Sequence, residues 1–184
     1  MHELEVKILD VQPELIVPVI ESFGGVKEFE GDIVAEYFDY TSGSKNKKLK
    51  KQGRTLRLRR RGDSTELALK RTTRNGGVKR AVEHETNVDD FEDMKGILRE
   101  LHLEVIRRIT KHRLSYMLLD GEHDIHFEFD TLPNLPTYLE IESPVEDKLW
   151  KWVRNLGFER EQAKPWSTKD VIEWYEKQQK KRKK

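Results

Sequence analysis

Apolar and charged residues alternate along several short segments of the chain. In the first of them, residues 3–9, the apolar positions are Leu4, Val6 and Ile8, and their neighbours are charged. A period of two is the pattern of a β-strand with one apolar face. The same reasoning predicts strands over residues 33–40, 55–61, 66–71, 78–87, 105–117, 124–130 and 138–143.

Apolar residues at helical spacing predict helices between these strands. Helices are expected over residues 13–22, 88–103 and 145–156, followed by a last helix capped by Ser167 or Thr168. No internal repeat and no linker divides the chain, so we expect one domain over residues 1–184, with a basic tail at about 178–184. This order of elements is typical of an α+β protein with a mostly antiparallel sheet or barrel and helices outside.

The composition is polar but not that of a disordered chain. Charged residues make up 38% of the 184 residues, yet the net charge is only +1 and there are four Trp, five Tyr and seven Phe. The absence of Cys excludes disulfides and thiolate metal sites. No apolar segment precedes the first strand, and no run reaches the roughly 18 apolar residues of a membrane span. These features predict a cytoplasmic protein with no membrane partner.

The polar faces of the predicted strands carry full charges grouped by sign. The basic faces comprise Arg57, Arg59, Lys70, Lys111 and Arg113. The acidic faces comprise Glu3, Glu5, Glu128, Asp130, Glu140 and Glu142, with Lys7 beside the first two. Carboxylates suit a hard cation such as Mg²⁺ or Mn²⁺, whereas guanidinium and ammonium groups suit phosphate oxygens. If the sheet closes, the two sets face each other and form a site for a metal-chelated polyphosphate.

The ordered set of motifs resembles the CYTH family, the triphosphate tunnel metalloenzymes. The matching motifs are Glu-x-Glu-x-Lys at residues 3–7, Tyr-Phe-Asp at 37–39, Arg-x-Arg at 57–59, and Lys-x-Arg at 111–113. They continue with Lys70, with Arg80 followed by Glu83 and Glu85, and with Asp130 followed by Glu140 and Glu142. The resemblance implies a closed eight-stranded antiparallel β-barrel, or tunnel, with a charged interior and helices packed outside.

The resemblance also implies roles for these residues. It assigns metal binding to Glu3, Glu5, Asp130, Glu140 and Glu142, and phosphate binding to Lys7, Arg57, Arg59, Lys70, Arg80, Lys111 and Arg113. Glu5, Lys7 and Arg57 are the expected catalytic residues, and Glu83, Glu85 and Glu128 are secondary candidates. One ion would bridge phosphate oxygens, and a second, bound partly through Glu5, would activate a water. Arg80 has the opposite strand parity to Glu83 and Glu85, so the three share a face only if a bulge intervenes.

Several functions fit such a site. Hydrolysis of inorganic tripolyphosphate comes first, because it requires only phosphate and metal contacts. Thiamine triphosphate comes next, with a ring that Trp150 or Trp166 could stack. Formation of cyclic AMP from ATP needs a pocket for the base, and the sequence gives no signal for one. A non-catalytic alternative is a polyphosphate- or RNA-binding module that uses the lysines of residues 45–51 and 180–184. We expect a small-molecule triphosphate as partner rather than nucleic acid, and a monomer or homodimer. The six histidines show no zinc spacing.

Overall fold

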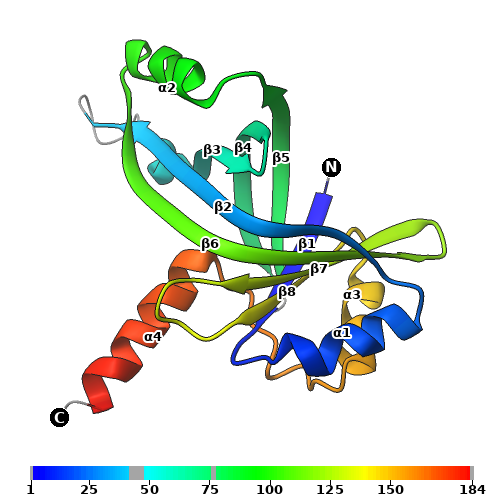
Figure 1. The fold of residues 1–184 in the computed structure, drawn as a ribbon. Helices are drawn as coiled ribbons and strands as arrows, with labels where there is room; N and C mark the ends of the chain where they lie inside the picture. The colour runs from blue at the N-terminus through cyan, green and yellow to red at the C-terminus, as the bar shows by residue number, and fades with distance from the viewer. Residues whose placement is uncertain (1, 42–47, 76–77, 183–184) are drawn as a thin grey trace.

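The computed structural model describes residues 2–41, 48–75 and 78–182, and these form an antiparallel sheet with helices around it (Figure 1). Side chains are described for all of these except residues 2, 3, 72–75, 78–81 and 182. The strands are β1 (His2–Ile8), β2 (Val26–Tyr40), β3 (Arg54–Arg61), β4 (Ser64–Asn75), β5 (Val78–Val88), β6 (Leu103–Asp120), β7 (His123–Thr131) and β8 (Tyr138–Ser143). The helices are α1 (Pro13–Ser22), η2 (Leu49–Gln52), α2 (Phe91–Glu100), α3 (Glu146–Asn155) and α4 (Thr168–Arg182).

The strand pairs follow the order β1–β5–β4–β3–β2–β6–β7–β8, and β1 pairs with β8 as well, so the pairing makes a circuit. This circuit covers only part of the strands. β1 meets β5 only at Lys79–Val82, whereas β5 continues to Val88 with β4 as its one partner among the described strands. Similarly, β7 pairs with β6 only from His112 onward, although β6 begins at Leu103.

The prediction of a closed barrel therefore needs correction. The sheet is strongly curled, but it stands open along the first half of β6 and the second half of β5, where β7, β8 and β1 do not reach. The reason is unequal strand length, because β2 and β6 have 15 and 18 residues while β1 and β8 have seven and six. The α+β class and the antiparallel order of eight strands are as predicted.

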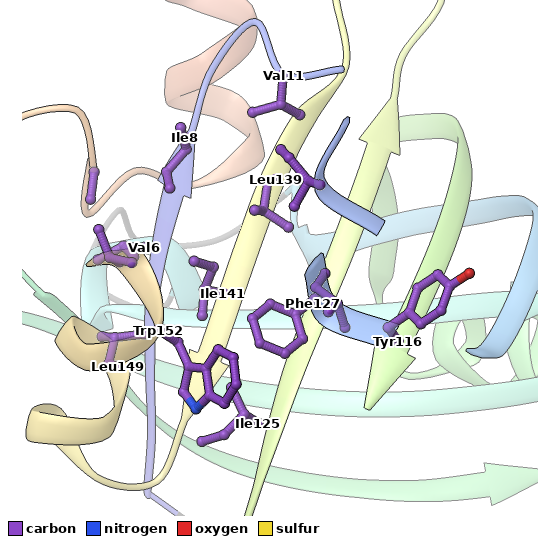
Figure 2. Packing of buried hydrophobic residues seen from close by; sticks show 14 of the residues in the cluster. Val6, Ile8, Val11, Tyr116, Ile125, Phe127, Leu139, Ile141, Leu149 and Trp152 are labelled. Atoms are coloured by element: carbon purple, nitrogen blue, oxygen red, sulfur yellow. The ribbon is translucent and has the colours of Figure 1, made fainter. Parts of the chain in front are cut away.

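The apolar faces of the strands point outward and are covered by helices. Against β1, β7 and β8, α1 and α3 bury a core that includes Val6, Phe127, Ile141, Leu149 and Trp152 (Figure 2). Full burial of such a side chain contributes about 1.5–3 kcal/mol. A second core lies under α2 on the β2–β3 side, with Phe38, Leu58, Phe91 and Leu98. The alternation thus leaves the charged faces for the interior of the curl.

Helix α4 packs beside β6 near the open side of the sheet (Figure 1). Its Val171 and Tyr175 pack against Ile109 of β6 and Tyr138 of β8. The helix start is fixed by reciprocal hydrogen bonds, because Ser167 N–H donates to Asp170 Oδ2 at 2.8 Å and Asp170 N–H donates to Ser167 Oγ at 3.3 Å. The predicted Ser167 cap is therefore confirmed. Within the described part of the chain, no helix has the length and apolarity needed to cross a membrane.

Several element boundaries differ from the sequence prediction, and two of them are informative. The helix expected over residues 88–103 begins at Phe91, because Asp90 caps it by accepting the N–H of Asp93 at 2.8 Å. β2 begins at Val26 rather than at residue 33, and a register shift between Lys27 and Phe29 interrupts the strict alternation there.

Candidate functional site

Charged side chains from seven strands meet on the inner face of the curled sheet. They are Glu5 and Lys7 of β1, Arg57 and Arg59 of β3, Glu66 and Lys70 of β4, Glu83 and Glu85 of β5, Lys111 and Arg113 of β6, Glu128 and Asp130 of β7, and Glu140 and Glu142 of β8. Strand alternation selects them, since their neighbours Leu56, Leu58, Phe127, Phe129, Leu139 and Ile141 are in the outer cores.

Three carboxylates converge where β1 pairs with β8. Oxygen atoms of Glu5, Glu140 and Glu142 lie within 4.8 Å of one another, and Glu5 is directly opposite Glu142 in the strand register. The buried ammonium of Lys7 donates to Glu5 Oε1 at 3.2 Å and also contacts Glu140 Oε1. Three carboxylates at this separation suit a hard divalent cation, so these residues could hold a metal ion.

Arg113 organises the neighbouring group of charges. Its Nε and Nη2 donate to the two carboxylate oxygens of the fully buried Asp130 at 2.6 and 2.7 Å. The same guanidinium contacts Glu128 and lies 3.4 Å from Glu140 Oε2. Lys111 Nζ also lies 2.5 Å from Asp130 Oδ2. The carboxylate of Asp130 is therefore paired with two cations, and it is not part of the three-carboxylate cluster.

A second acidic cluster lies on β4 and β5. Oxygen atoms of Glu66, Glu83 and Glu85 also lie within 4.8 Å of one another. Glu66 accepts hydrogen bonds from Arg57 at 2.8 Å and Arg59 at 2.7 Å. Lys70 pairs with Glu83 at 2.6 Å. This cluster is thus interleaved with the basic residues of β3 and β4.

A small cavity of about 20 Å³ lies between the basic strands and the start of α4. Its lining comprises Ile33, Ala35, Tyr37, Arg57, Arg59, Ile109, Lys111 and Thr168. The Nε atoms of Arg57 and Arg59 are buried and have no hydrogen-bond partner among the described residues. Buried N–H groups normally have partners, so these two donors are available to a ligand in the cavity.

The electrostatics keep most of these groups ionised. Burial opposes the charge of Lys7, but Glu140 and Glu5 outweigh it and raise the pKa of Lys7 well above its usual value. Burial alone would raise the pKa of Asp130, but the positive charges of Arg113 and Lys111 outweigh it and lower this pKa. Lys111 differs, because burial and the adjacent Arg113 lower its pKa to about 8. Burial and then Glu66 raise the pKa of Glu85, as expected where carboxylates crowd together.

Two predicted residues are placed only by their backbone. Glu3 lies in β1 opposite Ala81, and the side chain of Glu3 is outside the described residues. The side chain of Arg80 is also outside them, and the register sets its position opposite Leu4, whereas Lys79 is opposite Glu5. The pairing of β4 with β5 is regular over Val78–Val88, so it contains no bulge that would bring Arg80 into the register series of Glu83 and Glu85.

Sequence reasoning missed Glu66 among the inner charges. It stands four residues before Lys70 on the same strand, so alternation alone would have found it.

Asp39, from the Tyr-Phe-Asp motif, binds backbone groups rather than the inner charges of the site. It accepts the N–H groups of Leu49 and Lys50, at 2.8 and 3.3 Å, and so anchors η2. Trp150 is in the outer core and does not face the inner charges, whereas Trp166 packs near Trp174 in the cluster that includes Ile109 and Tyr138. Residues 42–47 of the lysine-rich segment and 183–184 of the tail lie outside the described residues.

Comparison with known families decides the relationship of this chain. The model of the CYTH domain matches residues 1–172. The chain belongs to the CYTH family. The match runs through all eight strands and ends inside α4, so the two carboxylate clusters and the arginines of β3 are within the CYTH domain. No curated protein matches the chain.

Solved structures share the CYTH fold at low sequence identity. A protein from Pyrococcus horikoshii is 22% identical with a TM-score of 0.69, and the match covers 90% of this chain and 96% of that one. A "putative adenylate cyclase" from Vibrio parahaemolyticus is 16% identical with a TM-score of 0.76, covering 94% and 98%. A "putative adenylyl cyclase" from Hippeastrum, described as having a dominant triphosphatase activity, is 16% identical with a TM-score of 0.63, covering 93% and 95%. At such identities these likenesses establish the fold.

Proposed function

We propose that this protein catalyses the metal-dependent hydrolysis of a triphosphate inside the curled sheet. The observation that supports it is the position of the acids relative to the bases. The cluster of Glu5, Glu140 and Glu142 is centred on β1 and β8, and β8 is four strands from β3 in either direction around the circuit. The buried, unpartnered Nε donors of Arg57 and Arg59 therefore lie on the wall opposite the carboxylates.

The residues present fit a divalent cation. Glu5, Glu140 and Glu142 offer only oxygen atoms, which favours Mg²⁺ or Mn²⁺ over softer metals. When bound, such an ion supplies positive charge to the phosphate oxygens and lowers the pKa of water. The second cluster of Glu66, Glu83 and Glu85 has the same chemistry, but Arg57, Arg59 and Lys70 already neutralise it in part.

The basic residues have distinct parts in the proposed reaction. Arg57 and Arg59 hold phosphate oxygens through donors that are unused in this structure. Lys7 sits among the carboxylates, and substrate binding would draw its ammonium from Glu5 and Glu140 toward a phosphate oxygen. There it would neutralise charge that grows in the transition state. Arg113, already held by three carboxylates, positions Asp130 and Glu140 rather than the substrate.

Inorganic tripolyphosphate is the smallest substrate that this site would accept, because it needs only phosphate contacts. The direct test is to incubate the purified protein with Mg²⁺ or Mn²⁺ and tripolyphosphate, thiamine triphosphate or ATP, and to measure phosphate, pyrophosphate and cyclic AMP separately. Metal-dependent release of phosphate is the expected result. Release of cyclic AMP and pyrophosphate from ATP would assign a cyclase instead.

A pair of variants separates catalysis from general charge effects. Glu5→Gln removes one carboxylate of the cluster and should abolish metal-dependent turnover while the circular dichroism spectrum stays unchanged. Glu122→Gln, at an exposed turn residue, is the matched control and should retain full activity. Full phosphate release by Glu5→Gln would refute the assignment. Salt-sensitive RNA binding without phosphate release from any substrate would favour the non-catalytic alternative.

A further inference from the structure

Tyr37 of β2 lies between two arginines of the neighbouring strands. In the register it is directly opposite Arg57 of β3 on one side and Arg107 of β6 on the other. The guanidinium carbon of Arg107 lies 4.4 Å from the centroid of the Tyr37 ring. Burial lowers the pKa of Arg57, but Tyr37, followed by Glu66, outweighs burial, so this pKa is raised. One aromatic ring thus joins Arg107 to the basic wall of the proposed phosphate site.

Arg107 belongs to the inner face of β6, whereas its neighbour Arg108 belongs to the outer face. Ile109, two residues after Arg107, lines the same cavity as Tyr37, so strand alternation places Arg107 on the inner side. The register shift between β2 and β6 comes after Tyr37 and does not alter this assignment. The side chain of Arg108 is 60% exposed, with Nη1 3.9 Å from Glu36 Oε1. Two successive arginines therefore have different surroundings.

Arg107 carries a buried donor that nothing in the described part of the chain accepts. Its Nη1 atom is buried and has no hydrogen-bond partner there, as is also true of Arg57 Nε. Arg113 on the same strand differs, because its guanidinium contacts three carboxylates. Stacking on Tyr37 covers a face of the Arg107 guanidinium and leaves its in-plane N–H groups for oxygen acceptors. An unpartnered, buried and charged donor points to an anionic ligand.

The position of Arg107 is at the open side of the sheet. β7 pairs with β6 only from His112 onward, so β2 is the one partner of β6 beside Arg107 among the described strands. The start of α4 is also close, since Thr168 lines the cavity together with Tyr37 and Arg57. Arg107 therefore extends the basic wall of β3 across β2 to β6, at the level where a ligand bound by Arg57 would meet the open side.

We propose that Arg107, held in place by its stack on Tyr37, is a further substrate-binding residue that contacts the phosphate group at the open side of the site. This rests on the proposed function, because the ligand is the triphosphate of that site. Arg107 is not paired with either acidic cluster, so it would hold a phosphate oxygen equally in the ground state and in the transition state. Such uniform binding lowers KM and leaves kcat unchanged.

The test compares the two successive arginines of β6. Inorganic tripolyphosphate is titrated by calorimetry in buffer with a metal chelator, where no metal-dependent turnover occurs, into the wild type, Arg107→Gln, Arg107→Lys and the matched control Arg108→Gln. Loss of a hydrogen bond between two charged groups corresponds to a Kd that is roughly 10- to 150-fold higher. We expect this increase for Arg107→Gln, a smaller one for Arg107→Lys, which keeps the charge without the planar stack, and none for Arg108→Gln.

Kinetics with metal provide a second measurement. Arg107→Gln should raise KM for tripolyphosphate by a factor similar to the change in Kd, with kcat within about twofold of the wild type. A Kd for Arg107→Gln equal to that of the wild type would overturn the proposal, and a lowered Tm as its only effect would assign Arg107 a structural part. Equal weakening by Arg108→Gln would also overturn it, because total charge would then suffice. Failure of the proposed function is separate, since it is absence of metal-dependent phosphate release, whereas the Kd values need no turnover.

Discussion

Glu5 of β1 and Glu142 of β8 occupy directly opposite positions in neighbouring strands. Two carboxylates at such positions repel each other unless cations intervene. Lys7 supplies one positive charge on the β1 side, where it contacts Glu5 and Glu140. The register of two short strands thus holds the acids in a geometry that a divalent cation would stabilise.

The first prediction concerns this cluster. Mg²⁺ or Mn²⁺ should raise the Tm of the protein by several degrees, because a ligand that binds only the folded state stabilises it. Glu142→Gln removes one charge and should abolish most of this increase, whereas Glu122→Gln should retain it. Differential scanning calorimetry with and without metal gives the measurement. An undiminished increase in Glu142→Gln would place the ion elsewhere.

Arg57 and Arg60 lie on opposite faces of β3, so their variants test whether the inner face carries the activity. Arg57 faces the cavity, while Arg60 packs over Phe91 of α2 on the outer side, with 5.4 Å between guanidinium carbon and ring centroid. Hydrogen bonds to charged groups contribute about 1.5–3 kcal/mol, so Arg57→Ala should lower kcat/KM for tripolyphosphate by roughly 10- to 150-fold. Arg60→Ala should change it little. Steady-state kinetics would contradict the model if both variants lost activity equally.

Asp130 should be essential for stability. It is fully buried and accepts two hydrogen bonds from Arg113. Asp130→Asn would leave Arg113 and Lys111 short of negative charge and should lower the free energy of unfolding by about 3 kcal/mol. Asp124→Asn, at an exposed position of the same strand, is the control. Urea denaturation measures both, and a loss below about 1 kcal/mol for Asp130→Asn would show that Glu128 and Glu140 suffice.

Asp120 predicts a pH dependence of stability at a site remote from the inner face. Its carboxylate accepts hydrogen bonds from Lys151 and Trp152 of α3 at 2.8 and 3.0 Å, and these contacts, with Lys148, lower its pKa to about 2. Because the folded pKa is depressed, the stabilisation is complete above the unfolded pKa of about 3.9 and is lost as the pH falls through 2.

The corresponding variant is Asp120→Asn. It should be less stable than the wild type by about 2 kcal/mol at pH 7, and the difference should shrink between about pH 4 and pH 2. Chemical denaturation at a series of pH values measures it. A difference that stays constant down to pH 2 would mean that the contacts do not depend on the charge of Asp120.

The local pattern of the chain predicted the faces of the strands well. Leu4, Val6 and Ile8 are in the outer core and Glu5 and Lys7 are inside, as alternation requires. The extent of closure could not be predicted, because it depends on which residues of β1 and β5 pair, and hydrophobic pattern carries no information on that register. The position of Asp130 could not be predicted either. The sequence motif groups it with Glu140 and Glu142, but in the structure its carboxylate is bound by Arg113.

The division of each strand into a charged inner face and an apolar outer face limits how the gene can change. Deleting or inserting one codon within β3, for example, would exchange Arg57 and Arg59 with Leu56 and Leu58, burying guanidinium groups under α2 and lining the interior with leucine. Length variation among descendants of this chain should therefore accumulate at the turns between strands, while point substitutions remain the route by which the interior acquires new specificity.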